Sequence, residues 1–264
     1  MVVCTLGDLL LDVIVRLDSR LAPGDDAAAR TTLAPGGQAA NVAAWAAALA
    51  AQARIVAVQA DDDAGSMLRR ELGGRGVEVC GPRGERTGVV VSLVQPAGDR
   101  TMASDRGSAP QLRPDDLDPA WLECDALHLS GYSLMQAPIS GAAERAAALA
   151  RERGARVSVD LSSWTHIERF GETMREALAH IRPDVVFGNE LEWDAIGDVD
   201  TDVRVVKRGA RGILVDEKEH AAIPVDAVDS TGAGDALAAG FIVGGPRAAL
   251  ETAARCVAQV GAMP

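Results

Sequence analysis

Short runs of β-branched and other apolar residues alternate with longer, alanine-rich segments along this 264-residue chain. The runs are Arg54–Gln59, Ala126–Ser130, Val157–Asp160, Val185–Gly188 and Val203–Lys207. Their length is typical of buried strands, and the segments between them are long enough for helices. Parallel strands need long crossover connections, which are usually helical. The alternation therefore predicts an α/β fold with a mostly parallel sheet flanked by helices.

A glycine-containing run near the end of the chain indicates phosphate chemistry. Asp229-Ser230-Thr231-Gly232-Ala233-Gly234-Asp235 leads into an apolar helical stretch. Unpaired N–H groups and the positive end of the helix dipole at Gly232, Ala233 and Gly234 can receive an anion. Asp235 follows at once, where a carboxylate can act as general base toward a hydroxyl. We predict phosphoryl transfer to an alcohol; the alternative is a glycine-rich helix cap with an ordinary acidic residue.

A second glycine pair, in Pro35-Gly36-Gly37-Gln38-Ala39-Ala40-Asn41, also leads into a helix-like segment. Alone it indicates only a turn. Together the two runs resemble the PfkB carbohydrate kinases, the ribokinase-like family, whose signatures are GG-x-x-x-N and D-[TS]-T-G-A-G-D. Both signatures occur here in the order and spacing of the family.

The resemblance implies a ribokinase-like three-layer sandwich with a small β-sheet lid, in one domain over residues 1–264. Segments 13–33 and 87–107 are strand-like but are broken by turn residues, and they resemble the lid inserted in the α/β core. A sugar would bind between lid and sheet. Exposed lid edges could pair two copies of the chain, so a homodimer through the lid is also expected.

The resemblance also implies ligands and their residues. The substrate residues are Asp12, Gly36, Gly37, Asn41 and Arg106, and the nucleotide residues are Asn189, Glu192, Lys207, Gly209 and Gly212. The cofactors are ATP and Mg²⁺, the latter held through water near Asn189 and Glu192, with K⁺ as a further candidate at Asp229 and Thr231. Simpler explanations are a turn for Asp12, a helix cap for Asn41 and an Asx turn for Asp229.

The chain departs from the family pattern in the substrate region. Ser130-Gly131-Tyr132 stands where ribokinase has a glutamate that contacts the sugar, which argues against ribose. Arg100 and Arg106 suit a carboxylated sugar such as 2-keto-3-deoxygluconate. A nucleoside is the second substrate class, although aromatic residues make up only 3% of the chain. A noncatalytic nucleotide or sugar sensor is the alternative from another class, and the presence of Asp235 argues against it.

Charge and cysteine content limit the partners and the compartment. A net charge of −12 argues against nonspecific binding to nucleic acid or to anionic membranes. The partner that the resemblance implies is a small-molecule sugar. The four cysteines are widely separated and form no C-x-x-C pair, and no secretion signal is evident at the start of the chain. We therefore expect a cytoplasmic protein.

Overall fold

The larger sheet forms the centre of the molecule. The structure, a computed structural model, describes residues 1–22, 24, 26–96 and 100–264. Within them the strand order is β15-β14-β13-β12-β11-β10-β1-β4-β6, and β13 through β6 are mutually parallel. These strands are β1 (Val2–Leu6), β4 (Gln52–Val56), β6 (Val77–Cys80), β10 (Ala126–Ser130), β11 (Arg156–Asp160), β12 (Val185–Asn189), β13 (Val203–Lys207), β14 (Ile213–Val215) and β15 (Lys218–His220). The predicted, mostly parallel sheet is confirmed.

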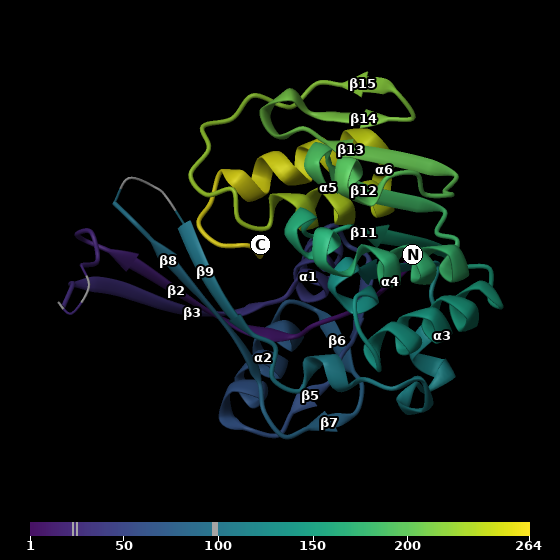
Figure 1. Cartoon of the computed structure of the whole chain (residues 1–264), viewed down its shortest axis with the longest axis horizontal. Helices are drawn as coiled ribbons and strands as arrows, with labels where there is room; N and C mark the ends of the chain where they lie inside the picture. The colour runs from purple at the N-terminus through teal and green to yellow at the C-terminus, as the bar shows by residue number, and fades with distance from the viewer. Residues whose placement is uncertain (23, 25, 97–99) are drawn as a thin grey trace.

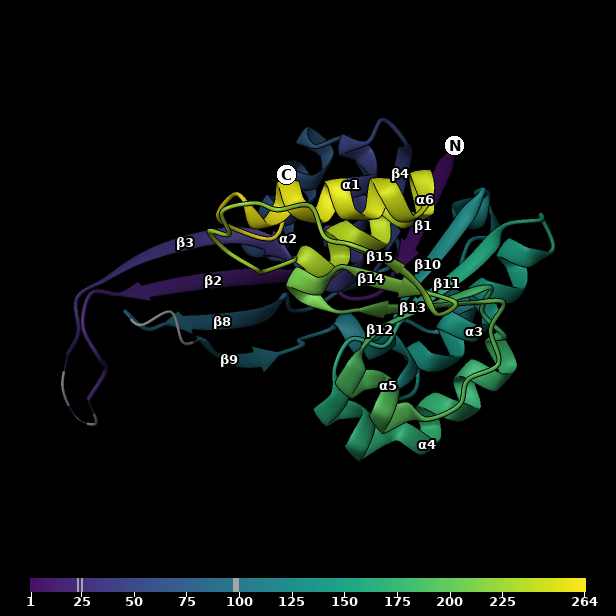
Figure 2. The ribbon, with the colours of Figure 1, turned by 90° about the horizontal axis from the view of Figure 1, so that it is seen from above.

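Helices cover both faces of this sheet (Figure 1, Figure 2). They are α1 (Gln38–Ala48), α2 (Asp63–Gly74), α3 (Ile139–Arg151), α4 (Trp164–Ile181), α5 (Glu190–Ile196) and α6 (Ala233–Val257). Short 3₁₀ turns are η1 (Ala109–Gln111), η2 (Pro114–Asp116), η3 (Pro119–Leu122), η4 (Gly131–Leu134) and η5 (Gly209–Arg211). In the described residues, no helix combines the length and apolar character that crossing a membrane requires.

Two hydrophobic cores result, one on each face. The residues of α1, α2 and α6 pack with Val3, Ile55 and Phe187, whereas those of α3, α4 and α5 pack with Leu6 and Leu127. Val3 and Leu6 come from the same strand and point to opposite faces, as the pleat of a strand requires. Burial on both faces explains why these strands are continuous apolar runs. The three-layer α/β arrangement expected from the sequence is confirmed.

The first of the predicted strands is displaced. The apolar run Arg54–Gln59 corresponds to β4, which begins at Gln52 and ends at Val56. Gln59 instead starts the two-residue strand β5 (Gln59–Ala60), which pairs with β7 (Arg83–Gly84). Ala57 and Val58 between them are buried, so the hydrophobic pattern continues where the hydrogen-bonded strand has already stopped.

A second, smaller sheet extends away from the larger one (Figure 1, Figure 2). Its strand order is β3 (Ala29–Gly36), β2 (Leu10–Leu17), β8 (Gly88–Val94) and β9 (Arg100–Asp105). The central strands β2 and β8 are parallel, and each outer strand is antiparallel to its neighbour. We call these four strands the small sheet. Residues 23, 25 and 97–99 of the predicted lid segments lie outside the described residues.

Candidate active site

The glycine run forms the N-terminal end of α6. Gly232 is the N-cap, with a left-handed φ of 76°, and a Cβ at this position would lie 2.7 Å from the Cα of Ala262. Only glycine suits this combination of backbone angle and close contact. Gly232, Ala233 and Gly234 thus lie at the N-terminal end of α6, where the first N–H groups have no partner within the helix, although the Ala233 N–H donates to the Ser230 carbonyl at 3.3 Å. This geometry can receive an anion.

Asp229 holds the loop before α6 in place. Its Oδ1 accepts hydrogen bonds from the backbone N and the Oγ1 of Thr231, at 2.9 and 2.6 Å, and its Oδ2 accepts one from Gly261 N at 3.1 Å. Burial alone raises the pKa of Asp229, but these hydrogen bonds outweigh it and the pKa lies below its usual value. This is the Asx-turn geometry that the sequence left as an alternative to a K⁺ site.

Asp235, in the first turn of α6, meets the second signature across the site. Asn41 Nδ2, from α1, donates a 2.7 Å hydrogen bond to Asp235 Oδ2. Burial raises the pKa of Asp235 to about 7, with Asp160 adding to the rise while Asn41 and Lys207 oppose it. A carboxylate with a pKa near neutrality is suited to accept a proton.

The Asn41 side chain is 6% exposed, and its Oδ1 is buried without a hydrogen-bond partner among the described residues. A buried, unpaired amide oxygen costs about 1–3 kcal/mol relative to a paired one. A hydroxyl donor on a bound molecule would satisfy it. Asn41 therefore has one side-chain group on Asp235 and another available for a ligand.

Asp12 lies against the glycine pair. A Cβ on Gly36 would lie 2.2 Å from the Asp12 carboxyl carbon, and one on Gly37, whose φ is 97°, would lie 2.2 Å from the Asp8 carbonyl oxygen. Both glycines are needed for this close approach. Burial raises the pKa of Asp12 to about 6, and the positive charge of Arg100 opposes the rise. The structure thus brings the predicted residues Asp12, Gly36 and Gly37 together with Asn41 at the start of α1.

Arg106 lies at the edge of this group with its guanidinium in an ion pair. Its Nε and Nη2 donate to the two carboxylate oxygens of Asp8 at 2.6 and 2.8 Å, and Nη2 also donates to the Tyr132 carbonyl at 3.2 Å. The Asp8 side chain is only 7% exposed. The sequence predicted that Arg106 contacts the substrate and did not indicate Asp8 as its ion-pair partner. No local pattern marks this partner, which is 98 positions away.

Lys207 ends β13 and reaches toward the glycine run. Its Nζ donates to Asp160 Oδ1 and Oδ2 at 2.9 and 2.8 Å and lies 3.9 Å from Glu192 Oε2. A Cβ on Gly234 would lie 3.4 Å from this Nζ, so the ammonium lies beside the first turn of α6. Burial lowers the pKa of Lys207, but Asp160 and Glu192 outweigh it and the pKa is raised. Lys207 is therefore a permanent cation.

Asp160, fully buried at the end of β11, was missed in the sequence. A signal was present, because a carboxylate directly follows a buried apolar run. The carboxyl ends of parallel strands meet at one edge of a sheet, where ligands of such sheets usually bind. Lys207 and Asn189 end neighbouring strands at the same edge.

Asn189 and Glu192 form a closed capping box at the start of α5. Asn189 N and Nδ2 donate to the Glu192 carboxylate at 2.8 and 2.9 Å, and Glu192 N donates to Asn189 Oδ1 at 2.9 Å. Burial raises the pKa of Glu192 more than Lys207 lowers it. The described residues contain no cluster of three or more His, Cys, Asp or Glu that could hold a metal ion. Both Glu192 carboxylate oxygens already accept hydrogen bonds from Asn189, so Mg²⁺ at this edge would bind through water and substrate phosphates rather than directly to this pair.

Gly209 begins the turn η5 that follows Lys207, and Gly212 comes directly after this turn. Their φ values are 56° and 88°, and a Cβ on Gly212 would lie 2.0 Å from the His220 carbonyl oxygen. Gly212 therefore has a structural reason to be glycine. Space around Gly209 is open, with no atom within 4 Å of a Cβ placed there. The structure places both at the same sheet edge as Lys207.

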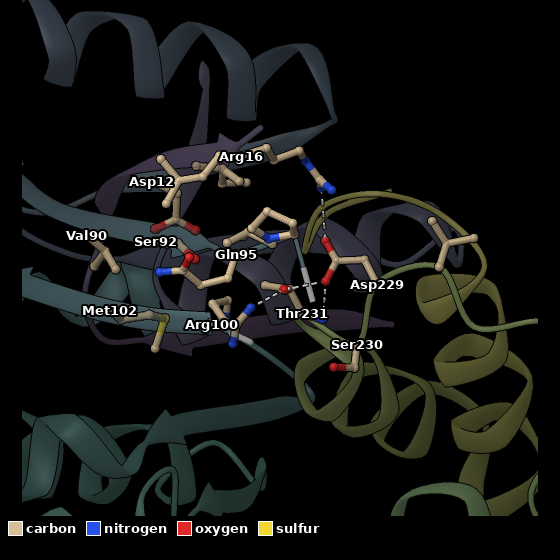
Figure 3. Close-up of a pocket in the computed structure, with 15 residues that line it drawn as sticks. Asp12, Arg16, Val90, Ser92, Gln95, Arg100, Met102, Asp229, Ser230 and Thr231 are labelled. Atoms are coloured by element: carbon tan, nitrogen blue, oxygen red, sulfur yellow. Dashed lines mark hydrogen bonds and ion pairs between the residues drawn. The ribbon is translucent and has the colours of Figure 1, made fainter. Parts of the chain in front are cut away.

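A cleft of about 490 Å³ separates the small sheet from the loop before α6 (Figure 3). It is lined by Asp12, Ile14, Arg16, Leu17, Val90, Ser92, Val94, Gln95, Pro96, Arg100 and Met102 on one side and by Val228, Asp229, Ser230 and Thr231 on the other. Arg100 Nη1 donates a hydrogen bond to Thr231 Oγ1, and Arg16 Nη2 lies 3.7 Å from Asp229 Oδ2. The cleft joins the predicted substrate residue Asp12 to the residues that precede the anion-receiving turn.

Known proteins resemble this chain in sequence or in fold. An ATP-dependent ribose-1-phosphate kinase of Halopiger xanaduensis is 33% identical over 96% of the chain and 90% of its own length. Among solved structures, an adenosine kinase from Sinorhizobium meliloti has a TM-score of 0.88 at 23% identity, covering 99% of this chain and 95% of its own. A putative ribokinase II from E. coli, in complex with ATP and Mg²⁺, has a TM-score of 0.79 at 23% identity and covers 99% and 94%.

The family assignment rests on sequence as well as on fold. The model of the pfkB family carbohydrate kinases matches residues 2–263. That span includes both glycine-containing signatures and every candidate site residue described above. The chain belongs to the pfkB family of ATP-dependent carbohydrate kinases, and its fold is ribokinase-like.

Proposed function

We propose that this kinase transfers the γ-phosphate of ATP to a hydroxyl of a small sugar, with Asp235 as general base. The observation that carries the proposal is the position of Asp235, which lies in the anion-receiving turn of α6 and is hydrogen-bonded to Asn41 of the other signature. In the reaction, the bond between the γ-phosphorus and the β,γ-bridging oxygen breaks. A bond forms to the sugar oxygen, the hydroxyl proton passes to Asp235, and ADP leaves.

The other residues of the site position and neutralise charge. The N–H groups of Gly232 to Gly234 would receive the oxygens of the transferring group, and the Lys207 ammonium beside them would balance its negative charge. Asn189, Glu192, Lys207, Gly209 and Gly212 would bind the nucleotide. Mg²⁺, when bound near Asn189 and Glu192 through water, supplies further charge neutralisation at the phosphates. Asp229 and Thr231 would hold K⁺ if a monovalent cation contributes.

The acceptor would bind beside Asp12, Gly36, Gly37 and Asn41, near Arg106. Ionised Asp12 accepts hydrogen bonds from sugar hydroxyls, and the unpaired Oδ1 of Asn41 offers one more acceptor. None of the residues that line the described cleft is aromatic, so a nucleobase would find no stacking partner there. This favours a sugar over a nucleoside, the second candidate.

The decisive test is ADP release by the wild type and by Asp235→Asn with Mg-ATP and a panel of sugars and nucleosides. General base catalysis contributes about 10²- to 10⁴-fold, so we expect a loss of this size in kcat. Asp226→Asn is the matched control, because Asp226 is an exposed carboxylate in the preceding loop and should keep full activity. Equal turnover by the two variants would refute the assignment of Asp235. ATP binding without turnover in the wild type would favour the sensor.

We also infer a homodimer that forms through the small sheet. Strand register places Leu33, Val13, Val91 and Ala103 in one row across the face turned away from the cleft. Leu33 is 55% exposed, and Val13 and Val91 are partly exposed. Contiguous apolar surface of this kind is a common site of protein association. Since the four cysteines are free and buried, a reducing cytoplasm remains the proposed compartment.

A further inference from the structure

Three arginines of the small sheet stand in one row, and two of them, Arg16 and Arg100, line the cleft. Arg16 pairs with Val94 across β2 and β8, and Val94 pairs with Arg100 across β8 and β9. Paired residues of neighbouring strands point to the same face of a sheet. The Cα atoms of Arg16 and Arg100 are two strand spacings apart, about 10 Å. Two long side chains at this separation can converge on one small anion between them.

The N–H donors of these two guanidinium groups are not taken up by carboxylates. Among the described residues, neither Arg16 nor Arg100 donates a hydrogen bond to a carboxylate group. Arg16 lies 3.7 Å from Asp229, which is an ion pair without a hydrogen bond, and the Arg100 hydrogen bond goes to the neutral hydroxyl of Thr231. By contrast, Arg86 and Arg106 each donate two hydrogen bonds to one carboxylate. The donors of Arg16, and those of Arg100 other than Nη1, are therefore available to an anion in the cleft.

This row of arginines lies close to the place of the sugar. Asp12 is four residues before Arg16 on β2 and points to the same face, about 13 Å away between Cα atoms. The charge of Arg100 reaches both Asp12 and Asp229, since it lowers the pKa of each. Between Asp12 and the two arginines lies a row of three uncharged residues, Ile14, Ser92 and Met102. This arrangement matches one ligand that places a hydroxylated end at Asp12 and an anionic end at Arg16 and Arg100.

We propose that the acceptor is a sugar monophosphate, whose existing phosphate ester is bound by Arg16 and Arg100 while its free hydroxyl faces Asp235. The proposal rests on the kinase function proposed above and specifies its substrate class. A phosphate dianion matches two guanidinium groups in charge and offers oxygens for paired N–H donors. The existing ester is not broken, so the products are a sugar bisphosphate and ADP.

The test compares matched acceptors that differ only in the phosphate. ADP release is measured with Mg-ATP and ribose 1-phosphate, ribose, fructose 6-phosphate or fructose, and with 2-keto-3-deoxygluconate as a carboxylate. We expect kcat/KM for at least one sugar phosphate to exceed that of its unphosphorylated partner by tenfold or more. A preference for an unphosphorylated sugar or for the carboxylate would overturn the inference and leave the kinase function intact.

Variants locate the phosphate in the cleft. Loss of one hydrogen-bonded contact to a charged group lowers binding about 10- to 100-fold. We expect Arg16→Ala and Arg100→Ala to lower kcat/KM for the sugar phosphate by this factor more than they lower kcat/KM for the unphosphorylated sugar. Lysine at either position should restore part of the loss, because it keeps the charge without the paired donors.

Arg30→Ala is the matched control. Arg30 pairs with Arg16 in the same row of the small sheet, yet its side chain is 85% exposed and it does not line the cleft. Arg30→Ala removes the same charge from the same sheet, on β3, and should leave the sugar-phosphate preference unchanged. Equal effects of all three substitutions, or equal losses with both acceptors, would contradict a specific phosphate site.

A binding measurement separates failure of this inference from failure of the kinase function. Calorimetric titration of ribose 1-phosphate and fructose 6-phosphate into the Asp235→Asn protein needs no turnover. If either sugar phosphate binds, and binds more weakly when Arg16→Ala or Arg100→Ala is added to Asp235→Asn, the inference is supported. This holds even if the wild type releases no ADP. Absence of binding in a folded protein that turns over free sugars would overturn it.

Discussion

At the scale of single residues, the proposed role of Asp235 as general base predicts how the reaction depends on pH. A base must be ionised to accept a proton, and burial raises this pKa to about 7. Below pH 7 the protonated fraction grows, so we expect kcat/KM to fall about tenfold per pH unit as the pH decreases from 7 to 5. A pH profile of ADP release at low substrate concentration measures this. A profile that stays level over this range would contradict the assigned role.

The same shift predicts how Asp235 affects stability. Because the pKa in the folded protein exceeds that of the unfolded chain, the folded state binds more protons between about pH 4 and pH 7, and its stability falls as the pH rises through that window. Asp235→Asn removes this dependence. We expect its melting temperature to exceed that of the wild type at pH 8 and to approach it at pH 5. A constant difference at both pH values would show that Asp235 titrates as an ordinary surface carboxylate.

The Lys207–Asp160 pair predicts a strong coupling. Removing one partner of a buried ion pair leaves an uncompensated charge and costs about 3–5 kcal/mol. We expect Lys207→Met to lose free energy of unfolding in this range, since Asp160 is fully buried, and Lys207→Met with Asp160→Leu to recover most of it. Urea denaturation of the two single variants and the double variant measures the coupling. If the double variant lost the sum of the two single losses in free energy of unfolding, the two residues would not be energetically coupled.

Residues of the site differed in how far the sequence could identify them. Asp235 and Asn41 belong to signatures, and the structure places them in contact. Asp8 and Asp160 carry no signature, because their partners Arg106 and Lys207 lie far away in the chain. A long-range ion pair leaves no local periodicity, so spacing alone could not predict it. The catalytic and binding roles of all these residues remain predictions.

At the scale of elements, the start of α6 is fixed by one glycine. Alanine at Gly232 would combine a left-handed φ with a Cβ only 2.7 Å from Ala262. We expect Gly232→Ala to cost about 1–3 kcal/mol and to lower ADP release. Gly73→Ala in α2 is the control, because no atom lies within 4 Å of its added Cβ; it should gain about 0.5–1 kcal/mol. Thermal unfolding compares the stability of the two variants with that of the wild type. A Gly232→Ala protein as stable as the wild type would contradict the need for glycine at the start of α6.

Elements also show where the sequence pattern stops being informative. Apolar runs indicated β10 and β13 with their observed ends, since buried parallel strands are uniformly hydrophobic. The pattern could not show that β2 pairs in parallel with β8, whose residues lie more than 70 positions later. Pairing between distant strands is set by the packing of the whole domain. The resemblance to a family supplied the small sheet, and local pattern alone indicated only strand-like segments.

At the scale of the whole molecule, the apolar face of the small sheet predicts the oligomeric state. We expect light scattering after size exclusion to give a dimer. Leu33→Lys should shift it toward monomer by placing a charge in the interface. Leu191→Lys is the control, because Leu191 is 56% exposed on α5 and distant from the small sheet in Figure 1. A wild-type monomer at micromolar concentration would refute the dimer.

The four strands of the small sheet also have one end in common. Leu10 is aligned with both Gly36 and Gly88, and Asp105 is aligned with the neighbouring Val89, so every strand joins the rest of the molecule along a single line. A rigid plate attached along one line can turn only about that line, and each point moves in proportion to its distance from it. Asp12 lies two residues from this axis and Arg16 lies six. An opening movement therefore carries the arginine about three times as far as the aspartate. A ligand would be released first at its outer end, while the end nearest the axis is still held.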